Sequence, residues 1–356
     1  MIFLALKLFL RRGPRRLRVV YFRLMFRIST RTLALSAAAL LGGAPGAAAA
    51  PPGTSAVSTT PAQAAQGAMT LHLPGVFVVH RQAVTVPDRT LQVSGVVRPY
   101  VPGQWVTVRA FLGRRMIKRD RLRVKLSRRH GVGRFTERVR SPRAGAVTVT
   151  VTHARTAQQV GYQARRRYAV LAEPTGFGSR GPFVALIQQR LAALHLFLRQ
   201  SGVYDGGTGL AIDAYHRLLG WGTSQGLGGA TISALLNGRG HFHIRFPRHG
   251  HHAEGNLGKQ LLALADGGTV RYILPISSGK LSTPTILGDF HVYQRTPGYL
   301  PDGMYYSSFF IGGYAIHGYD PAPDFPASHG CMRLPIADAI PTYHWLGYGN
   351  WVDVYK

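Results

Sequence analysis

The sequence predicts a multidomain α+β protein with a β-sandwich, a small three-helix domain and a mainly-β C-terminal domain. Three observations support this prediction. The chain has 356 residues, which is enough for two or three hydrophobic cores. Apolar residues alternate with period two up to residue 171 and then recur at helical spacing. After residue 241, short strand-like stretches separated by Gly and Pro return.

Residues 1–50 have the composition of a secretory signal peptide, which starts at Met1 or at Met25. They hold nine Lys or Arg and no acidic residue, and an Ala- and Leu-rich stretch ends in four alanines before Pro51. A basic segment, an apolar stretch and a small-residue cleavage site together are typical of export. An uncleaved membrane anchor is the alternative, although glycines and a proline at 42–46 interrupt the roughly 20 apolar residues that a bilayer requires.

Residues 51–68 are mostly Ala, Pro, Ser, Thr and Gln without apolar periodicity, which predicts a flexible linker. In residues 69–171, short alternating stretches such as 106–111 and 147–151 are separated by Gly and Pro turns. This pattern is typical of a β-sandwich of about a hundred residues. Since the segment carries no catalytic motif, we interpret it as a spacer or a binding module.

Most of the formal net charge of +29 belongs to this β-rich segment. Residues 51–171 hold 21 Lys or Arg against three acidic residues, whereas residues 172–356 hold 13 against 11. So basic a surface attracts polyanions. For an exported protein we expect anionic wall polymers or lipid headgroups as partners and no nucleic acid. A solubilising face without a dedicated partner is the alternative.

Residues 172–240 predict a small helical domain. Apolar residues recur there at helical spacing, at Val184, Ile187, Leu191, Leu194 and Leu198. Two further helices are expected over 210–219 and over 231–236, with Thr231 as the cap of the last. A generic helical spacer is one interpretation. The segment also resembles the peptidoglycan-binding-like three-helix domain, through Gly181, Val184, Leu186, Gln188, Leu191, Leu194, Tyr204, Asp205, Thr208, Ala211 and Thr231.

Cys331 is the only cysteine of the chain, and histidines accompany it. His329 and Gly330 precede it directly, and His317 lies fourteen positions upstream. A thiol attacks a carbonyl carbon as a thiolate, and a nearby imidazole is the usual means of forming one. A lone cysteine in this setting is therefore a candidate acyl-transfer nucleophile.

A buried structural cysteine is the alternative, because cysteine often serves as a small core residue. The sequence around Cys331 favours catalysis, since Ser328, His329 and Gly330 are poor core residues and three prolines at 321–326 predict a loop. One cysteine cannot form an intrachain disulfide, which leaves an intermolecular bridge as the other use of a thiol in an oxidising compartment.

Five histidines gather in residues 241–252. Imidazole is a common metal ligand, so a metal site is one interpretation. However, no cysteine or acidic residue lies at finger-like spacing to these histidines. We therefore interpret the segment as a linker that enters the first strand of the C-terminal domain, and we predict no metal site.

The last 110 residues carry a series of short motifs in a fixed order. The motifs are Ser278-Gly279, Thr283-Pro284-Thr285, Gly288 with Phe290, Ala315-Ile316-His317-Gly318 and Ser328-His329-Gly330-Cys331-Met332-Arg333-Leu334. Together they resemble the L,D-transpeptidase (YkuD-type) catalytic domain, which we place at residues 241–356. The resemblance implies a mainly-β domain that remodels peptidoglycan stem peptides.

The resemblance also implies roles for individual residues. Cys331 would form a thioester with the stem peptide and expel its terminal D-alanine, and His317 would be the general base. His329 shares a face with Cys331, so spacing alone leaves both histidines as candidates, and the family pattern favours His317. Ser328, His329 and Gly330 would shape the nucleophile loop.

Three further features concern the stabilisation and binding of the substrate. Gly330 allows backbone amides near Cys331 to approach an oxyanion closely, and we expect the Cys331 amide to be one donor. Arg333 and Gly318 are candidate substrate-binding residues, because a guanidinium can hold a carboxylate through paired hydrogen bonds. A structural ion pair of Arg333 with Asp338 is the alternative.

We therefore expect an exported, cell-wall-associated cysteine L,D-transpeptidase that cross-links stem peptides and uses no cofactor. Membrane contact is expected only if the signal segment is uncleaved. Two alternatives share the same residues or the same location. An L,D-carboxypeptidase would resolve the thioester with water, and a non-catalytic protein would bind the cell wall through its basic and helical segments.

Overall fold

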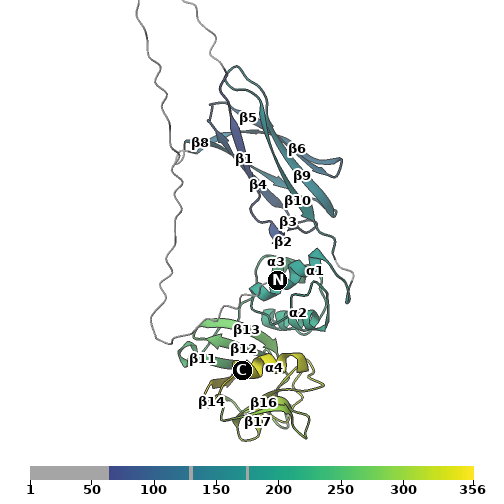
Figure 1. Ribbon diagram of the computed structural model, residues 1–356, viewed down its shortest axis with the longest axis vertical. Coiled ribbons are helices and arrows are strands. Elements are labelled where there is room, and N and C mark those ends of the chain that lie inside the picture. The colour runs from purple at the N-terminus through teal and green to yellow at the C-terminus, as the bar shows by residue number, and fades with distance from the viewer. Residues whose placement is uncertain (1–63, 128–130, 174–175) are drawn as a thin grey trace, which may run out of the picture. The chain divides into compact units, whose positions relative to one another are not determined.

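The computed structural model describes residues 64–127, 131–173 and 176–356. All described residues fall within one of the two units of the chain, and Figure 1 draws their strands and helices. The predicted export signal at 1–50 and most of the predicted linker at 51–68 lie outside the described residues. Within the described ranges, no helix combines the length and the apolar character needed to cross a bilayer.

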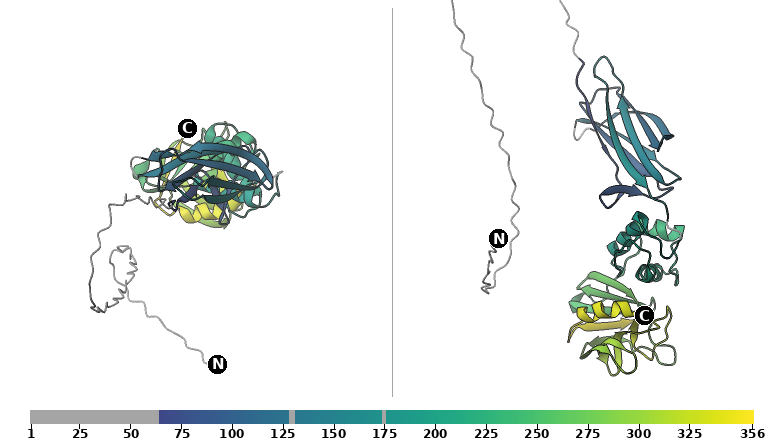
Figure 2. Two further views of the ribbon diagram at one scale, coloured as in Figure 1. Left: turned by 90° about the horizontal axis from the view of Figure 1, so that it is seen from above. Right: turned by 45° about the vertical axis from the view of Figure 1, so that its right-hand side comes forward.

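The N-terminal part of this unit consists of ten strands. They are β1 (Ala68–His72), β2 (Phe77–Val79), β3 (Gln82–Thr85), β4 (Leu91–Arg98), β5 (Trp105–Leu112), β6 (Arg115–Arg123), β7 (Lys125–Ser127), β8 (Val132–Val139), β9 (Gly145–His153) and β10 (Tyr162–Val170). One sheet has the order β1-β4-β8-β7 and the other the order β2-β3-β10-β9-β5-β6. Figure 2 shows these strands from two further directions.

The two sheets share one apolar core. Val93 and Val97 of β4 and Val108 and Val149 of the other sheet are fully buried in a single cluster. Alternate residues of a strand point to opposite faces, which is why the period-two pattern of the sequence fills this core. The expected β-rich N-terminal region is thus confirmed.

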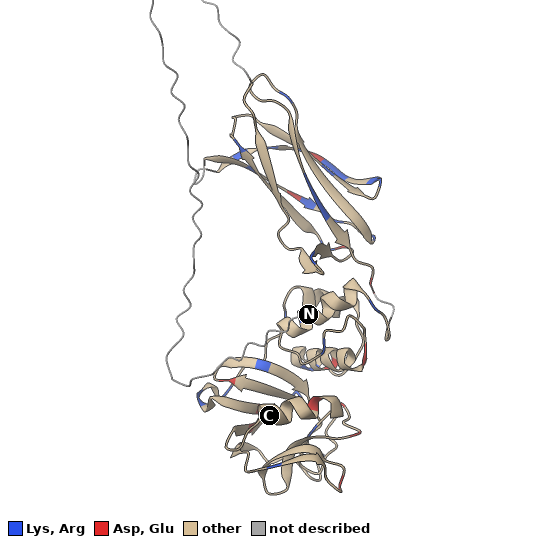
Figure 3. Ribbon diagram, viewed as in Figure 1, with Lys and Arg blue, Asp and Glu red and all other residues tan. Residues whose placement is uncertain are grey.

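Lys and Arg outnumber Asp and Glu along these strands (Figure 3). All three carboxylates of residues 51–171 form ion pairs with only two basic side chains, Arg140 and Lys118. Asp88 lies 2.8 Å from Arg140, and Asp120 and Glu137 lie 2.7 and 3.4 Å from Lys118. Most of the 21 Lys and Arg in this segment therefore lack a carboxylate within it, which leaves the positive charge uncompensated.

Three helices follow, α1 (Pro182–Ala193), α2 (Gly206–Leu219) and α3 (Gly229–Leu236). α1 has Pro at its first position, and α2 is capped by Asp205, whose carboxylate accepts the Thr208 amide at 2.9 Å. This cap starts α2 four residues before the predicted position. The predicted cap Thr231 instead lies inside α3, where its hydroxyl contacts His216 at 2.8 Å.

The first helix is shorter than the apolar spacing predicts. Leu194 and Leu198 lie beyond its end, because the chain turns at His195 with φ 66° and leaves the helix. The Phe197 amide then donates to the Ile273 carbonyl at 2.9 Å, and the Ile273 amide donates to the His195 carbonyl at 2.7 Å. The predicted helical leucines thus lie in a segment that pairs with a strand of the C-terminal domain.

Gln188 of α1 connects this helix to the turn at residues 202–208. Its side chain is fully buried, and its amide donates to the Val203 carbonyl and to the Thr208 hydroxyl, each at 2.9 Å. Its amide oxygen accepts the Gly202 N–H at 2.7 Å. A buried amide needs such partners, so Gln188 and the 202–208 turn fix each other.

The C-terminal domain is mainly β. Its strands are β11 (His251–Asn256), β12 (Leu261–Asp266), β13 (Thr269–Pro275), β14 (Gly288–His291), β15 (Gln294–Tyr299), β16 (Tyr305–Ile311), β17 (Tyr314–Gly318), β18 (Met332–Leu334) and β19 (Trp351–Tyr355), and its helix is α4 (Ile336–Trp345). One sheet has the order β13-β12-β11-β19-β14 and the other the order β15-β16-β17-β18. The expectation of a mainly-β domain here is confirmed.

Arg217 of α2 joins the helices to this domain. Its guanidinium donates to the carbonyls of Gln260 and Ile276 at 3.0 and 3.1 Å and pairs with Asp213 at 2.5 Å. Both charged side chains are about 95% buried. A buried charge is tolerated only when it is paired and hydrogen-bonded, so this contact depends on every one of its partners.

We expect Asp213→Asn to lower the free energy of unfolding by about 3–5 kcal/mol, because it leaves the Arg217 charge buried without a counter-charge. Urea unfolding of the full chain measures this change. Asp88→Asn is the matched control, since the exposed Asp88–Arg140 pair contributes at most about 1 kcal/mol. Equal effects of the two substitutions would contradict a structural role for the buried pair.

Candidate active site

Cys331 and His317 line the same cavity of the C-terminal domain, which has a volume of about 470 Å³. β17 carries His317, and Cys331 directly precedes β18. These strands pair in parallel, with His317 opposite Arg333. The remaining lining residues are Asp302, Met304, Gly313, Tyr314, Tyr319, Ser328, His329 and Arg333.

The loop before Cys331 is held by Ser328 and Gly330. The fully buried Ser328 hydroxyl donates to the Cys331 carbonyl at 2.6 Å and accepts the Gly330 amide at 3.0 Å. Gly330 has φ 122°, and a Cβ at this position would lie 1.6 Å from the ring of Tyr314. Only glycine fits both the backbone conformation and the space, so these two residues set the position of the thiol.

The half-buried thiol of Cys331 has two backbone partners. Its sulfur accepts the Ala315 amide at 3.4 Å and lies 3.7 Å from the Gly313 carbonyl, to which the S–H donates. Burial raises the pKa of Cys331, and the Ala315 hydrogen bond only partly opposes this effect. The thiol therefore carries its proton at neutral pH.

The imidazole of His317 is buried and has a defined tautomer. Nδ1 lies 2.9 Å from the Gly318 carbonyl, which can only accept a hydrogen bond, so Nδ1 carries the proton and Nε2 has a lone pair. Burial lowers the pKa of His317 to about 4. At neutral pH the cavity thus combines a neutral thiol with a neutral imidazole base.

Arg333 lies against an aromatic ring. Its guanidinium carbon is 3.9 Å from the centre of the Tyr319 ring, and its backbone exchanges two hydrogen bonds with Ser277. The ion pairs of the described residues do not include Arg333. Asp338, the partner weighed from the sequence, is buried in α4, and burial raises the pKa of this carboxyl to about 7.

Of the other two predicted site residues, His329 lines the cavity and Gly318 does not. His329 is exposed, and its Nε2 lies 3.3 Å from Nζ of Lys280, which donates to it. Gly318 is buried and does not line the cavity; a Cβ there would lie 2.6 Å from Cβ of Ala339. Its contribution to the site is the carbonyl that holds His317.

The structure adds lining residues that the motifs do not contain. Asp302 lies in the turn between β15 and β16, and its carboxylate accepts a hydrogen bond from the Met304 amide at 3.2 Å. Tyr319 stands edge-on to His317 at 5.7 Å between ring centres. Met304 directly precedes β16, and Tyr314 begins β17. The aromatic composition of residues 304–314 is the one signal in the sequence that points to them.

Comparisons with known proteins find relatives of the C-terminal domain. Residues 251–354 match the model of the L,D-transpeptidase catalytic domain family, YkuD. The YkuD protein of Bacillus subtilis (strain 168), which is named as an L,D-transpeptidase, is 36% identical over 94 residues. This match covers 25% of the chain and 57% of the relative, so the chain spans little more than half of that protein's length.

Two solved structures are similar over a longer stretch. The L,D-transpeptidase of Xylanimonas cellulosilytica (residues 123–326) is 31% identical with a TM-score of 0.47, and that of Stackebrandtia nassauensis is 20% identical with a TM-score of 0.34. Each match covers 52% of this chain and 98% of the other. The resemblance of residues 172–240 to a peptidoglycan-binding domain stays a prediction. The matches to the C-terminal residues show that this chain carries, at residues 251–354, a catalytic domain of the YkuD family of L,D-transpeptidases.

Proposed function

We propose that the protein is an exported cysteine L,D-transpeptidase that cross-links peptidoglycan stem peptides through a thioester on Cys331. One observation carries the proposal: in a domain of this family, Cys331 and His317 line one cavity from neighbouring strands. The tautomer of His317 supports it, because Nε2 can accept a proton.

In the first step, Sγ of Cys331 attacks the carbonyl carbon of the third residue of a tetrapeptide stem, while Nε2 of His317 takes the thiol proton. Both groups are neutral beforehand, so charge develops only as the attack proceeds. The imidazolium then gives its proton to the departing D-alanine amine. The C–N bond breaks, and a thioester remains on Cys331.

In the second step, an amine of another stem attacks the thioester carbon and gives a proton to His317. The C–S bond breaks, the sulfur regains a proton, and a new amide joins the two stems. Water in place of the amine would release a shortened stem, which is the carboxypeptidase reaction. Both outcomes use the same intermediate and the same two side chains.

The surrounding residues support this chemistry in separate ways. Ser328 and Gly330 hold the loop so that the Cys331 amide can face the developing oxyanion. The Arg333 guanidinium, stacked on Tyr319 at the cavity wall, can bind a carboxylate of the stem. Lys280 occupies the lone pair of His329, which favours His317 as the base.

The segments before the catalytic domain would bring it to its substrate. The uncompensated positive charge of residues 51–171 supports binding to anionic wall polymers. The helices at 182–236 are the candidate for contact with peptidoglycan itself. The composition of residues 1–50 supports export.

Purified tetrapeptide stems, incubated with the full chain and analysed by mass spectrometry, test the proposal. We expect cross-linked dimers together with free D-alanine. Shortened stems without dimers would assign the chain as a carboxypeptidase. If neither product forms while the protein sediments with cell walls, the domain is non-catalytic. Cys331→Ala should abolish both products and leave sedimentation with walls unchanged.

The two histidines near Cys331 allow a matched comparison. We expect His317→Gln to lower kcat/KM by about 10²–10⁴-fold, because it removes the general base. His329→Gln should cause a much smaller loss, since this exposed ring contacts Lys280. Steady-state kinetics with the same stems measures both. A larger loss for His329→Gln would reverse the assignment of the base.

The protonation states predict the pH profile of kcat/KM. It should rise through a pKa of about 4, as His317 loses its proton, and stay level through neutral pH. The next change should follow ionisation of the thiol, whose pKa lies above the usual value. Activity regained after return from pH 4 to pH 7 excludes unfolding as the cause of the rise. A bell-shaped profile centred near pH 7 would contradict the neutral pair.

A further inference from the structure

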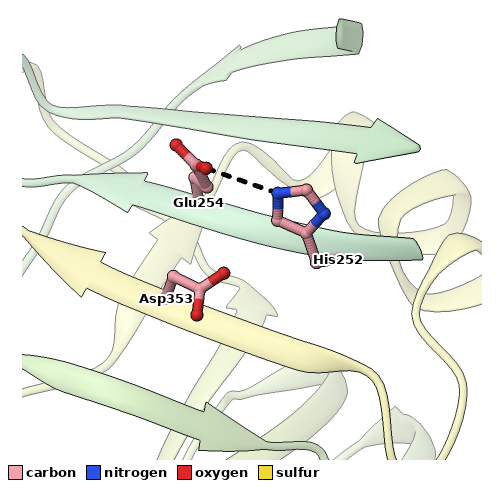
Figure 4. A group of neighbouring side chains, drawn as sticks. All are labelled: His252, Glu254 and Asp353. Atoms are coloured by element: carbon pink, nitrogen blue, oxygen red, sulfur yellow. Dashed lines mark hydrogen bonds and ion pairs between the residues drawn. The ribbon is translucent and has the colours of Figure 1, made fainter. Parts of the chain in front are cut away.

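The catalytic domain contains a second cluster of ionisable side chains, apart from the cavity of Cys331. His252 and Glu254 lie on β11 and Asp353 lies on β19, and all three are fully buried. One potential ligand atom of each lies within 4.8 Å of the others. Figure 4 shows His252 and Glu254 on one strand, joined by a dashed line, and Asp353 on the neighbouring strand.

Strand pairing brings this cluster together. β11 and β19 are parallel neighbours with Glu254 opposite Asp353, and His252 shares a face with Glu254 because the two lie two positions apart. Asp289 lies opposite Asp353 on β14 and adds a further negative charge to this row. Three neighbouring strands of one sheet thus each place a carboxylate at the same position of the strand pairing.

His252 has the geometry of a metal ligand. Its Nδ1 lies 2.8 Å from the Gly250 carbonyl, which can only accept, so Nδ1 donates and Nε2 faces Oε1 of Glu254 at 3.3 Å. A metal-binding histidine usually donates its other N–H to a carbonyl in this way. Two ligand atoms about 2.0–2.1 Å from a tetrahedral metal lie roughly 3.3 Å apart, which fits the observed separation.

The carboxylate of Asp353 provides an independent observation that points to a cation. Its Oδ1 lies 3.0 Å from Nδ1 of His249, but its buried Oδ2 has no hydrogen-bond partner within the described part of the chain. A carboxylate oxygen buried without a partner is costly. A cation among Asp353, Glu254 and His252 would satisfy this oxygen and balance two carboxylates.

The remaining contacts hold the cluster in place. Glu254 accepts the amides of Arg245 and Phe246 at 2.8 and 2.7 Å and the hydroxyl of Tyr355 at 2.9 Å. Such outer contacts orient a ligating carboxylate. His249, which contacts Asp353, has a side chain that is 22% exposed.

We propose that His252 Nε2, Glu254 and Asp353 bind one divalent metal ion of the zinc class, with His249 as an outer contact that orients Asp353. Imidazole and carboxylate ligands suit zinc and its neighbours in the transition series. All three side chains are fully buried, so the ion would be structural and would tie the first strand of the domain to the last. Without the ion, the contact between Nε2 and Oε1 is a hydrogen bond that needs a second ring proton, and this proton leaves when the metal binds.

The test uses the full chain with Cys331→Ala, which removes the thiol as a competing ligand. After treatment with a chelator and desalting, zinc sulfate is added, and bound zinc is counted by elemental mass spectrometry. We expect one zinc per chain and a rise in Tm of about 5–10 °C with free zinc at a hundredfold excess over Kd. No bound zinc and an unchanged Tm would overturn the proposal.

Variants locate the ion. Asp353→Asn keeps the shape of the side chain and should remove both the bound zinc and the shift in Tm. His249→Ala changes a partly exposed side chain, so the fold should survive, and we expect at least a tenfold weaker affinity for zinc. Wild-type zinc binding in a folded Asp353→Asn or His249→Ala protein would contradict the site.

Neighbouring histidines provide the controls. His251 is exposed on the same strand and pairs with Asp266 at 2.6 Å, and His241 and His243 are exposed in the segment before it. His251→Ala and the double variant His241→Ala/His243→Ala should bind zinc like the parent protein. A loss of zinc in either variant would assign the metal to surface histidines and overturn the buried site.

Discussion

The parallel pairing of β17 with β18 determines the geometry of the reaction site. Because His317 stands opposite Arg333, the imidazole, the guanidinium and the sulfur two residues before it share one cavity. The short loop before β18 has little freedom, since the Ser328 hydroxyl bonds to both the Gly330 amide and the Cys331 carbonyl. A shift of the pairing by one residue would turn His317 to the other face of the sheet.

The burial that builds the site also sets its chemistry. A buried thiol and a buried imidazole both avoid charge, so the resting enzyme is protected from reagents that seek a thiolate. Reactivity then depends on a bound carbonyl that can accept the electron pair of sulfur while the proton moves. For the exported enzyme proposed above, this arrangement would limit oxidation of Cys331, because a free thiolate is easily oxidised.

Patterns of nearby residues allowed much of this to be predicted. Period-two stretches identified the strands, and the motifs around His317 and Cys331 identified the two central side chains. Contacts between distant residues could not be predicted in this way. His252 and Asp353 lie 101 positions apart, so no short spacing in the sequence indicates that they are neighbours. Two further contacts form only when the chain folds. Tyr314 leaves no space for a side chain at position 330, and the Gly318 carbonyl fixes the tautomer of His317.

The contact between the helices and β13 has a consequence for the handling of this protein. β13 is the edge strand of its sheet, and the segment after α1 covers that edge, where the Ile273 backbone bonds to His195 and Phe197. An uncovered edge offers free N–H and C=O groups to any other strand. A fragment cut at residue 241 would expose this edge together with Leu261 and Ile273, which share a core with the helices. Such a fragment would therefore tend to aggregate through strand addition, even though every side chain of the reaction site remained on it.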